Sequence, residues 1–184
     1  KDLEIDQNTL IVFTSDNGTH FEDKHRPNYL DTFGPYDGGK RCMLEGGIRM
    51  PTLVRWPSVI TAGSKSGSLS QAHDWMATFC DLAGVQPPAL GDGVSLVPTI
   101  TGRGNQVRST VYSEFLGGWA TQPYEEFEPS RRGRKRGQMQ SILIGDYKGV
   151  RVNIQNHQGV FEVYHTLDDP KESTDLAGKA GVPT

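Results

Sequence analysis

Hydrophobic residues are unevenly spread, and two short runs near the start of the chain predict strands. Residues 10–13 (Leu-Ile-Val-Phe) are uncharged and rich in β-forming residues, which indicates a strand over 9–15 that is buried on both faces. Residues 50–57 form a second short run bounded by prolines, which is typical of a strand. Between them, residues 19–50 are polar and rich in glycine, and a loop of this length is usually functional or disordered.

The middle of the chain predicts one helix. Residues 72–83 carry their Trp, Met, Phe, Cys, Leu and Ala side chains at helical spacing, as in an amphipathic helix. Gly84 follows as a C-cap, and two consecutive prolines at 87–88 prevent the helix from resuming. Residues 89–108 are rich in turn-forming residues.

From residues 111–116 onward, the C-terminal third of the chain has the sequence pattern of short β-strands. Short β-like runs follow at residues 140–144, 147–153 and 160–164, and a Gly-Asp pair separates the first two as in a hairpin. The pattern predicts a small antiparallel sheet. The chain therefore mixes helix and strand, with the predicted antiparallel strands gathered at its C-terminal end.

The length and composition limit the number of domains and the class of protein. A chain of 184 residues is one domain or two small ones, and 35% hydrophobic residues with a net charge of −3 are typical of a globular protein. The mild acidity argues against a general nucleic-acid binder. No apolar run approaches the roughly 18 residues of a membrane span. The two cysteines, Cys42 and Cys80, are expected to be separate thiols, although a disulfide between them stays open.

Candidate chemistry begins where the first predicted strand ends. Asp16 and Asn17 follow it directly, and Gly18 permits a sharp turn. Open α/β sheets bind ligands at the carboxyl ends of their strands, and carboxylate and amide oxygens suit Ca²⁺ or Mg²⁺. Lys40 adds a movable positive charge nearby. A divalent cation held by Asp16 and Asn17, together with this ammonium group, is typical of a site that binds a multiply oxygenated anion. The alternative is that the Asp-Asn pair forms only a turn or a helix cap.

The glycine-rich loop around Lys40 has competing interpretations. Residues 34–40 match the P-loop pattern, but Arg41 replaces the required Ser or Thr and no strand directly precedes the loop, so this reading is rejected. A solvated loop lysine remains the simple alternative. Glu45 and Arg49 are interpreted as bracing the loop through an ion pair or backbone hydrogen bonds, with two glycines between them allowing close packing. A catalytic role for these two residues is the alternative.

A basic run at residues 131–136 is interpreted as a solvated, mobile loop. The alternative is that its positive field attracts a sulfated glycan. Trp119, Tyr124 and Phe127 lie nearby, and they are expected either to stack on sugar rings or to pack against the small sheet.

Several motifs, in this order and spacing, resemble the sulfatase family (arylsulfatase-like) of the alkaline-phosphatase superfamily. The matching stretches are Ser-Asp-Asn-Gly at 15–18, Gly-Gly-Lys at 38–40 with 45–51, Trp-Pro at 56–57, Asp-Leu-Ala-Gly at 81–84, 92–98, Gly-Asp-Tyr-Lys at 145–148, and Tyr164 with 167–172. The resemblance implies that residues 1–108 are the C-terminal part of the sulfatase α/β core sheet. Residues 109–184 would form a small antiparallel C-terminal subdomain with a helix.

The resemblance also implies roles for particular residues. Asp16 and Asn17 would ligate a divalent cation, usually Ca²⁺, with Mg²⁺ as the alternative. Lys40 would contact the substrate sulfate as a catalytic and substrate-binding residue. His20 would line the substrate pocket, and His25 is a further lone histidine in the same loop.

Other sulfatase elements are absent from the chain. The Cys/Ser-x-Pro-x-Arg motif that is converted to formylglycine does not occur, and neither Cys42 nor Cys80 fits it. The chain is therefore expected to be a C-terminal portion that is inactive and binds metal weakly or not at all on its own, since Ca²⁺ takes 6–8 oxygens. A missing N-terminal part would supply formylglycine and complete the core.

The complete enzyme would hydrolyse sulfate esters of small molecules or glycans. By resemblance, such an enzyme would be periplasmic, secreted or lysosomal. Two rival functions remain. One is a phosphodiesterase or phosphonate hydrolase of the same superfamily, and the other is a non-catalytic module that binds anionic glycans through the basic run.

Overall fold

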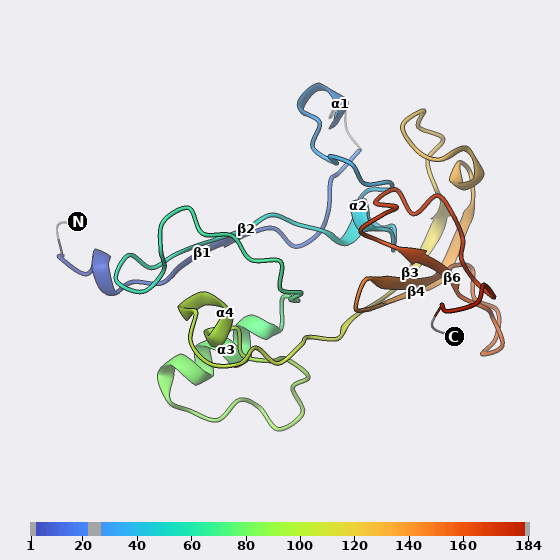
Figure 1. Ribbon diagram of the computed structural model, residues 1–184. Coiled ribbons are helices and arrows are strands. Elements are labelled where there is room, and N and C mark those ends of the chain that lie inside the picture. The colour runs from blue at the N-terminus through green and yellow to red at the C-terminus, as the bar shows by residue number, and fades with distance from the viewer. Residues whose placement is uncertain (1–2, 22–26, 183–184) are drawn as a thin grey trace. The chain divides into compact units, whose positions relative to one another are not determined.

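The computed structural model describes residues 3–21 and 27–182 (Figure 1). It divides into two compact units: unit 1 contains the chain up to Asp16 together with Pro51–Val111, and unit 2 contains Asn17–Met50 and the chain from Tyr112 onward. The elements, in chain order, are η1 (Asp6–Asn8), β1 (Ile11–Thr14), α1 (Pro27–Leu30), α2 (Glu45–Ile48), β2 (Thr52–Arg55), α3 (Asp74–Ala83), α4 (Val97–Thr101), β3 (Val111–Ala120), η2 (Pro129–Arg131), β4 (Lys135–Ile144), β5 (Tyr147–Arg151) and β6 (Glu162–His165).

In unit 1, both predicted strands form, and β1 pairs with β2 in antiparallel register from Ile11↔Arg55 to Thr14↔Thr52. The prediction that the first strand is buried on both faces is wrong, since Phe13 is 67% exposed. The physical reason is that, within residues 3–21 and 27–182, β1 has β2 as its sole strand neighbour in a two-stranded sheet. The apolar run encodes a strand suited to burial, but the described part of unit 1 does not supply covering layers.

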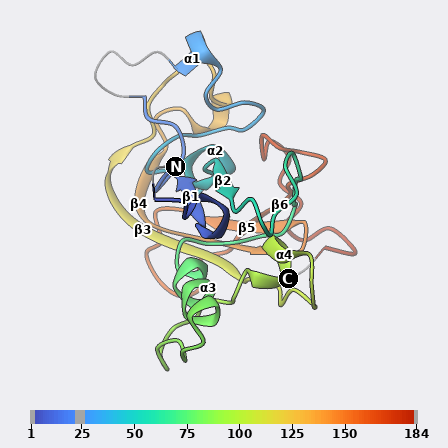
Figure 2. The same ribbon diagram turned by 90° about the vertical axis from the view of Figure 1, so that its left-hand side faces the viewer.

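The predicted helix is confirmed as α3, which lies beside the short α4 (Figure 2). Gly84 ends α3 in the left-handed conformation (φ 68°), and its N–H donates to the Asp81 carbonyl, as a C-cap glycine does. Asp74 is fully buried at the start of α3 and accepts hydrogen bonds from the backbone N–H groups of Gln71 (2.7 Å) and Val94 (2.9 Å). This carboxylate therefore fixes the segment before α3 and the segment leading into α4.

Unit 1 has little packed core. Its buried apolar side chains, within the described residues, are Ala77 and Leu96. The apolar face of α3 stays open, with Phe79 48% exposed, and a cavity of about 930 Å³ is lined by residues of β2, the loop after it, α3 and α4.

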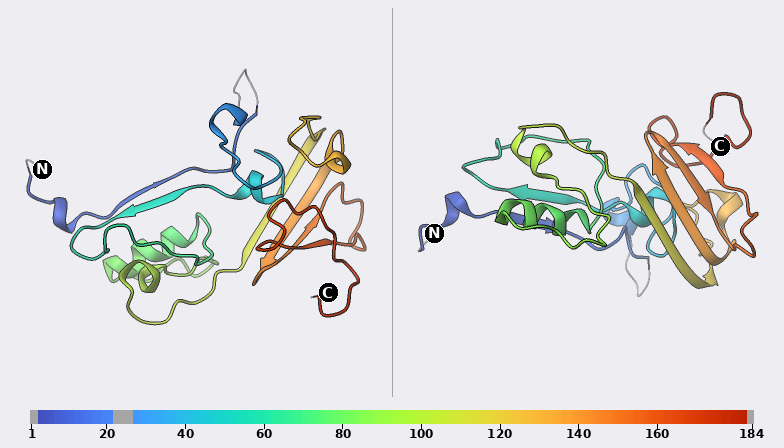
Figure 3. Two further views of the ribbon diagram at one scale, coloured as in Figure 1. Left: turned by 45° about the horizontal axis from the view of Figure 1, so that its top comes forward. Right: turned by 90° about the horizontal axis from the view of Figure 1, so that it is seen from below.

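Unit 2 is built on a four-stranded antiparallel sheet with the strand order β3-β4-β5-β6 (Figure 3). The predicted hairpin is confirmed: Ile144 pairs with Tyr147 across a two-residue turn, whose first residue, Gly145, has φ 64°. β4 begins earlier than predicted, at Lys135.

The core of unit 2 joins the glycine-rich loop to the sheet. Met43 from the loop packs with Met139, Val150 and Tyr164 from the strands. Glycines of the loop permit this close approach, since a Cβ on Gly46 would lie 2.4 Å from the Asp37 carbonyl oxygen. The predicted role of the paired glycines in close packing is confirmed.

A buried ion network ties the loop to the sheet. Lys148 of β5 is fully buried, and its Nζ lies 2.8 Å from Glu45 Oε1 and 3.2 Å from Glu172 Oε1. Glu172 also accepts the Glu45 backbone N–H (2.7 Å), and Glu45 pairs with Arg49. The interpretation that Glu45 and Arg49 brace the loop is therefore confirmed.

The two carboxyl groups of this network respond differently to burial. Burial raises the pKa of Glu45, but Lys148 and Arg49 outweigh it and hold that pKa below its ordinary value. Burial dominates at Glu172 and raises its pKa despite Lys148.

The basic run is not a solvated, mobile loop, and that interpretation is wrong. Arg131 is 6% and Arg136 7% exposed. Arg132 donates to the Phe127 carbonyl (2.8 Å), and Arg134 pairs with Glu162. The run contains the first two residues of β4, and several of its side chains are buried or paired with other residues of the fold.

Candidate functional site

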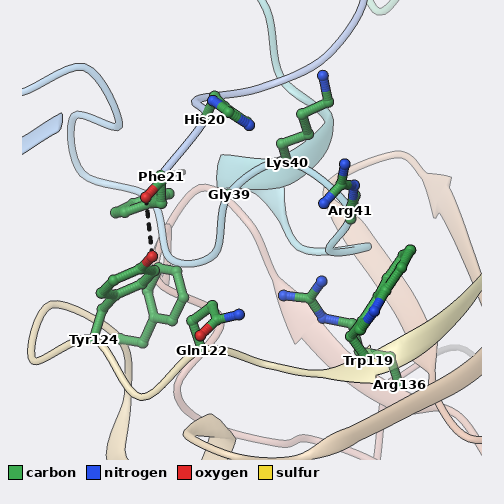
Figure 4. Close-up of a pocket in the computed structure, with 10 residues that line it drawn as sticks. His20, Phe21, Gly39, Lys40, Arg41, Trp119, Gln122, Tyr124 and Arg136 are labelled. Carbon is green, nitrogen blue, oxygen red and sulfur yellow. Dashed lines mark hydrogen bonds between the residues drawn. The ribbon is translucent and has the colours of Figure 1, made fainter. Parts of the chain in front are cut away.

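A pocket of about 230 Å³ lies within unit 2 (Figure 4). The glycine-rich loop and the segment before it form one side, and the end of β3, the loop after it and the start of β4 form the other. The lining residues are His20, Phe21, Gly39, Lys40, Arg41, Trp119, Gln122, Tyr124, Phe127 and Arg136.

The pocket brings together the two residues that were predicted to contact the substrate, Lys40 and His20. The Lys40 N–H donates to the Thr19 carbonyl at 2.6 Å, so the loop that carries Lys40 is tied to the residue before His20. Both side chains lie on the same rim, opposite Gln122 (Figure 4). His25 lies outside the described residues.

Aromatic side chains form the wall beneath that rim. Phe21 stacks on Tyr124 (ring centroids 5.0 Å) and meets Phe127 edge-on (5.1 Å). The Tyr124 hydroxyl donates to the Phe21 carbonyl (2.9 Å). Tyr124 and Phe127 thus pack on the loop before Lys40, an arrangement that neither sequence alternative described.

Sequence reasoning missed two polar pocket residues, Arg41 and Gln122, and treated a third, Arg136, only as a member of the basic run. The Arg41 guanidinium lies over the ring of Trp119, 5.3 Å from its centroid. Arg41 also has φ 72°, a left-handed conformation that is uncommon outside glycine. No local signal in the sequence separated Arg136 from its basic neighbours, because β4 begins at Lys135 whereas the strand was predicted to begin only at residue 140.

Asp16 and Asn17 lie where unit 1 passes into unit 2 along the chain, and neither is among the residues that line the pocket. Asp16 is exposed, and the Asn17 amide nitrogen donates to the Gly18 carbonyl (2.8 Å). Hard oxygen donors suit Ca²⁺, but these two supply only part of a 6–8 oxygen shell. Residues 3–21 and 27–182 hold no group of three or more His, Cys, Asp or Glu placed to bind a metal, so metal ligation stays a prediction.

The sequence comparison decides the family. Residues 32–183 match the profile of the family described as N-sulphoglucosamine sulphohydrolase, C-terminal. The chain belongs to this sulfatase family. The recognition drawn from the sequence motifs is therefore confirmed, as is the α/β fold class, because sulfatase-like structures superpose on nearly the whole chain.

The relatives of this sulfatase chain include carbohydrate sulfatases. It is 32% identical over 179 residues to an N-acetylglucosamine-6-O-sulfatase of Bacteroides thetaiotaomicron, covering 96% of the chain and 28% of that protein. It also resembles a solved structure in complex with its substrate D-glucosamine-2-N,6-O-disulfate (TM-score 0.66, 28% identity, 97% of the chain and 32% of the other). A phosphonate monoester hydrolase of Agrobacterium radiobacter superposes with a TM-score of 0.59 at 25% identity, over 97% of the chain and 33% of the other.

The chain spans 18% to 34% of the length of the curated relatives that it matches. Within the described residues, no helix is long and apolar enough to cross a membrane.

Proposed function

We propose that this chain is the C-terminal part of a sulfatase that hydrolyses sulfate esters of carbohydrates, and that Lys40 binds the reacting sulfate. The observation that carries the proposal is the pocket that joins Lys40 and His20 to polar and aromatic walls. Relatives named for sulfated amino sugars support the carbohydrate class of substrate.

The chemistry of the reaction explains why these residue types are needed. Sulfate ester cleavage develops negative charge on the leaving oxygen while a tetra-oxygen anion must stay fixed. The Lys40 ammonium can hold and polarise such an anion electrostatically. The His20 imidazole, on the same rim, is a hydrogen-bonding partner for the sugar beside the sulfate.

A divalent cation belongs to the proposal. Asp16 and Asn17 are two of its oxygen ligands, and the cation, when bound, orients and polarises the sulfate as a Lewis acid. Ca²⁺ suits this donor set, with Mg²⁺ as the alternative. The remaining ligands come from residues other than these two.

The rest of the core is proposed to come from an N-terminal part of the complete protein, which also carries the formylglycine nucleophile. Support comes from the uncovered apolar side chains of unit 1, such as Ile11 (47% exposed), Phe13 (67%) and Leu53 (65%). Side chains of this kind are normally buried. The chain alone is accordingly proposed to be inactive.

The test is kinetic and uses the complete protein that contains this chain. Lys40→Ala is expected to lower kcat/KM for an aryl sulfate by roughly 100-fold, the effect of losing one charge-stabilising group, with an unchanged melting temperature. Lys65→Ala is the matched control, since Lys65 is an exposed loop lysine of unit 1. An unchanged kcat/KM in Lys40→Ala would remove this lysine from the site.

A second candidate, phosphonate monoester hydrolysis, is favoured by the structural likeness to the Agrobacterium radiobacter enzyme. The same preparation assayed with a phosphonate monoester and a sulfate ester separates the two, because the proposal requires the larger kcat/KM for the sulfate ester. The non-catalytic glycan-binding module is not proposed, because the basic run that it relied on is only partly available at the surface: Arg131 is 6% and Arg136 7% exposed, and Arg134 pairs with Glu162.

A further inference from the structure

Arg136 is a buried cation for which the described residues supply no counter-ion. It is 7% exposed, and its Nε has no hydrogen-bond partner. Its neighbours in the run differ, since Arg134 pairs with Glu162 and Arg131 donates to the Glu172 carbonyl. Burying a charge without a partner is costly, and an anion bound from outside the chain would remove that cost.

The location of Arg136 says where that anion would lie. Arg136 is the second residue of β4 and lines the pocket together with Arg41 and Trp119. Figure 4 shows the guanidinium groups of Arg41 and Arg136 facing the same space, with the Trp119 ring beside them. Lys40 also lines the pocket, and in the same view its ammonium points away from the arginine pair, toward the outer edge of the site. The residues that line the pocket therefore supply positive charge at two positions, one at the Lys40 ammonium and one at the guanidinium groups of Arg41 and Arg136.

We propose that Arg136, with Arg41, forms a subsite for a second anionic group on the sugar whose sulfate Lys40 binds. A guanidinium fork matches the paired oxygens of a sulfate or a carboxylate. The exposed Trp119 ring (61%) offers a flat apolar surface beside this subsite, against which a sugar ring can pack. The substrate class is thus a sugar sulfate that carries another anionic oxygen substituent. This inference rests on the proposed function.

The experiment compares three substrates with the complete protein: a monosulfated hexosamine, the same hexosamine with a second sulfate, and a sulfated sugar that carries a carboxylate. The measured quantity is the ratio of kcat/KM for each doubly anionic sugar to that for the monosulfated one. Arg136→Gln is expected to lower this ratio roughly 10- to 100-fold, as the loss of charge-assisted hydrogen bonds does. The substrate with the larger loss identifies whether the subsite takes sulfate or carboxylate.

Lys135→Gln is the matched control, because it removes the same charge from the adjacent, exposed residue of β4 and should leave the ratio unchanged. Arg136→Lys keeps the charge but loses the fork, so it should give an intermediate ratio, and it replaces Arg136→Gln if that variant does not fold. Since no ion pair joins Arg136 to another residue within the described part of the chain, Arg136→Gln should not lower the melting temperature, whereas Arg134→Gln, which breaks the pair with Glu162, should.

Three results would overturn the inference: a wild-type protein without preference for doubly anionic sugars, an unchanged ratio in Arg136→Gln, or equal losses in Arg136→Gln and Lys135→Gln. Failure of the proposed function looks different, because the wild type would then hydrolyse none of the sugar sulfates. In that case calorimetric binding of the disulfated hexosamine decides, since the subsite requires weaker binding in Arg136→Gln than in Lys135→Gln.

Discussion

Replacing Lys148 by methionine should strongly destabilise unit 2. The ammonium lies 2.8 Å from Glu45 Oε1 and 3.2 Å from Glu172 Oε1 and is fully buried. At an effective dielectric constant of about 20, each attraction is about 5–6 kcal/mol before the desolvation cost is subtracted. Methionine keeps the length of the apolar stem but leaves two buried carboxyl groups without their shared cation.

The net loss expected from removing one partner of a buried ion network is about 3–5 kcal/mol. At about 2–4 °C per kcal/mol for a domain of 150–250 residues, the melting temperature should fall by roughly 6–20 °C. The assay is thermal unfolding of the complete protein, followed by tryptophan fluorescence. The deficit should narrow as the pH falls from about 7 to 5, because buried carboxyl groups without a cation have raised pKa values and become neutral on acidification.

Two further variants sharpen this test. Lys171→Met changes an exposed lysine next to Glu172 in the chain and should leave the melting temperature unchanged. Adding Glu172→Gln to Lys148→Met removes one of the two orphaned charges and should recover part of the loss. A fall of less than about 2 °C in Lys148→Met, or a deficit that widens in acid, would refute the reasoning that this network holds the loop to the sheet.

Three other predictions concern packing, pH and metal. Gly46→Ala should lower the melting temperature, because the new Cβ would lie 2.4 Å from a backbone oxygen. The control Gly118→Ala should leave it unchanged, since a Cβ there meets nothing within 4 Å. Equal effects of the two substitutions would contradict the packing argument. Burial raises the pKa of Glu162, but Arg134 outweighs it and holds the pKa below the ordinary 4.5. The stability that this ion pair contributes should be present above pH 4.5 and lost as the pH falls through the lower pKa of the folded state. The wild type should therefore lose more stability in acid than Glu162→Gln, and parallel pH profiles of the two would refute this prediction. Asp16→Ala in the complete protein should lower bound Ca²⁺ measured by elemental analysis, and undiminished Ca²⁺ would exclude Asp16 as a ligand.

Local signals predicted the local structure well. The α3 helix and its Gly84 cap followed from apolar spacing and a helix-stop residue, and the turn at Gly145 followed from a Gly-Asp pair between two β-like runs. Burial of β1 was predicted wrongly, because burial depends on neighbouring layers and not on the strand's own residues. The division at residue 108 stays a prediction about domains.

In the candidate site, too, features set by neighbouring residues in the sequence could be predicted, and features set by residues distant in the sequence could not. Lys40 was predicted from its glycine-rich loop and again from the family resemblance, and His20 from the resemblance alone. Arg136, by contrast, was concealed in a run of basic residues whose strand register only the fold reveals. Glu45 and Glu172 are 127 positions apart in sequence, so no local pattern could join them. Part of what the family motifs encode in this chain is a buried ion network that supports the loop of Lys40.

The most direct measurement of the central claim is a crystal structure of the complete protein with a sulfated sugar bound. The account predicts a sulfate oxygen within about 3 Å of Lys40 Nζ, with the sugar in the pocket beside His20. A sulfate held elsewhere, with the Lys40 ammonium in solvent and the pocket empty, would contradict it.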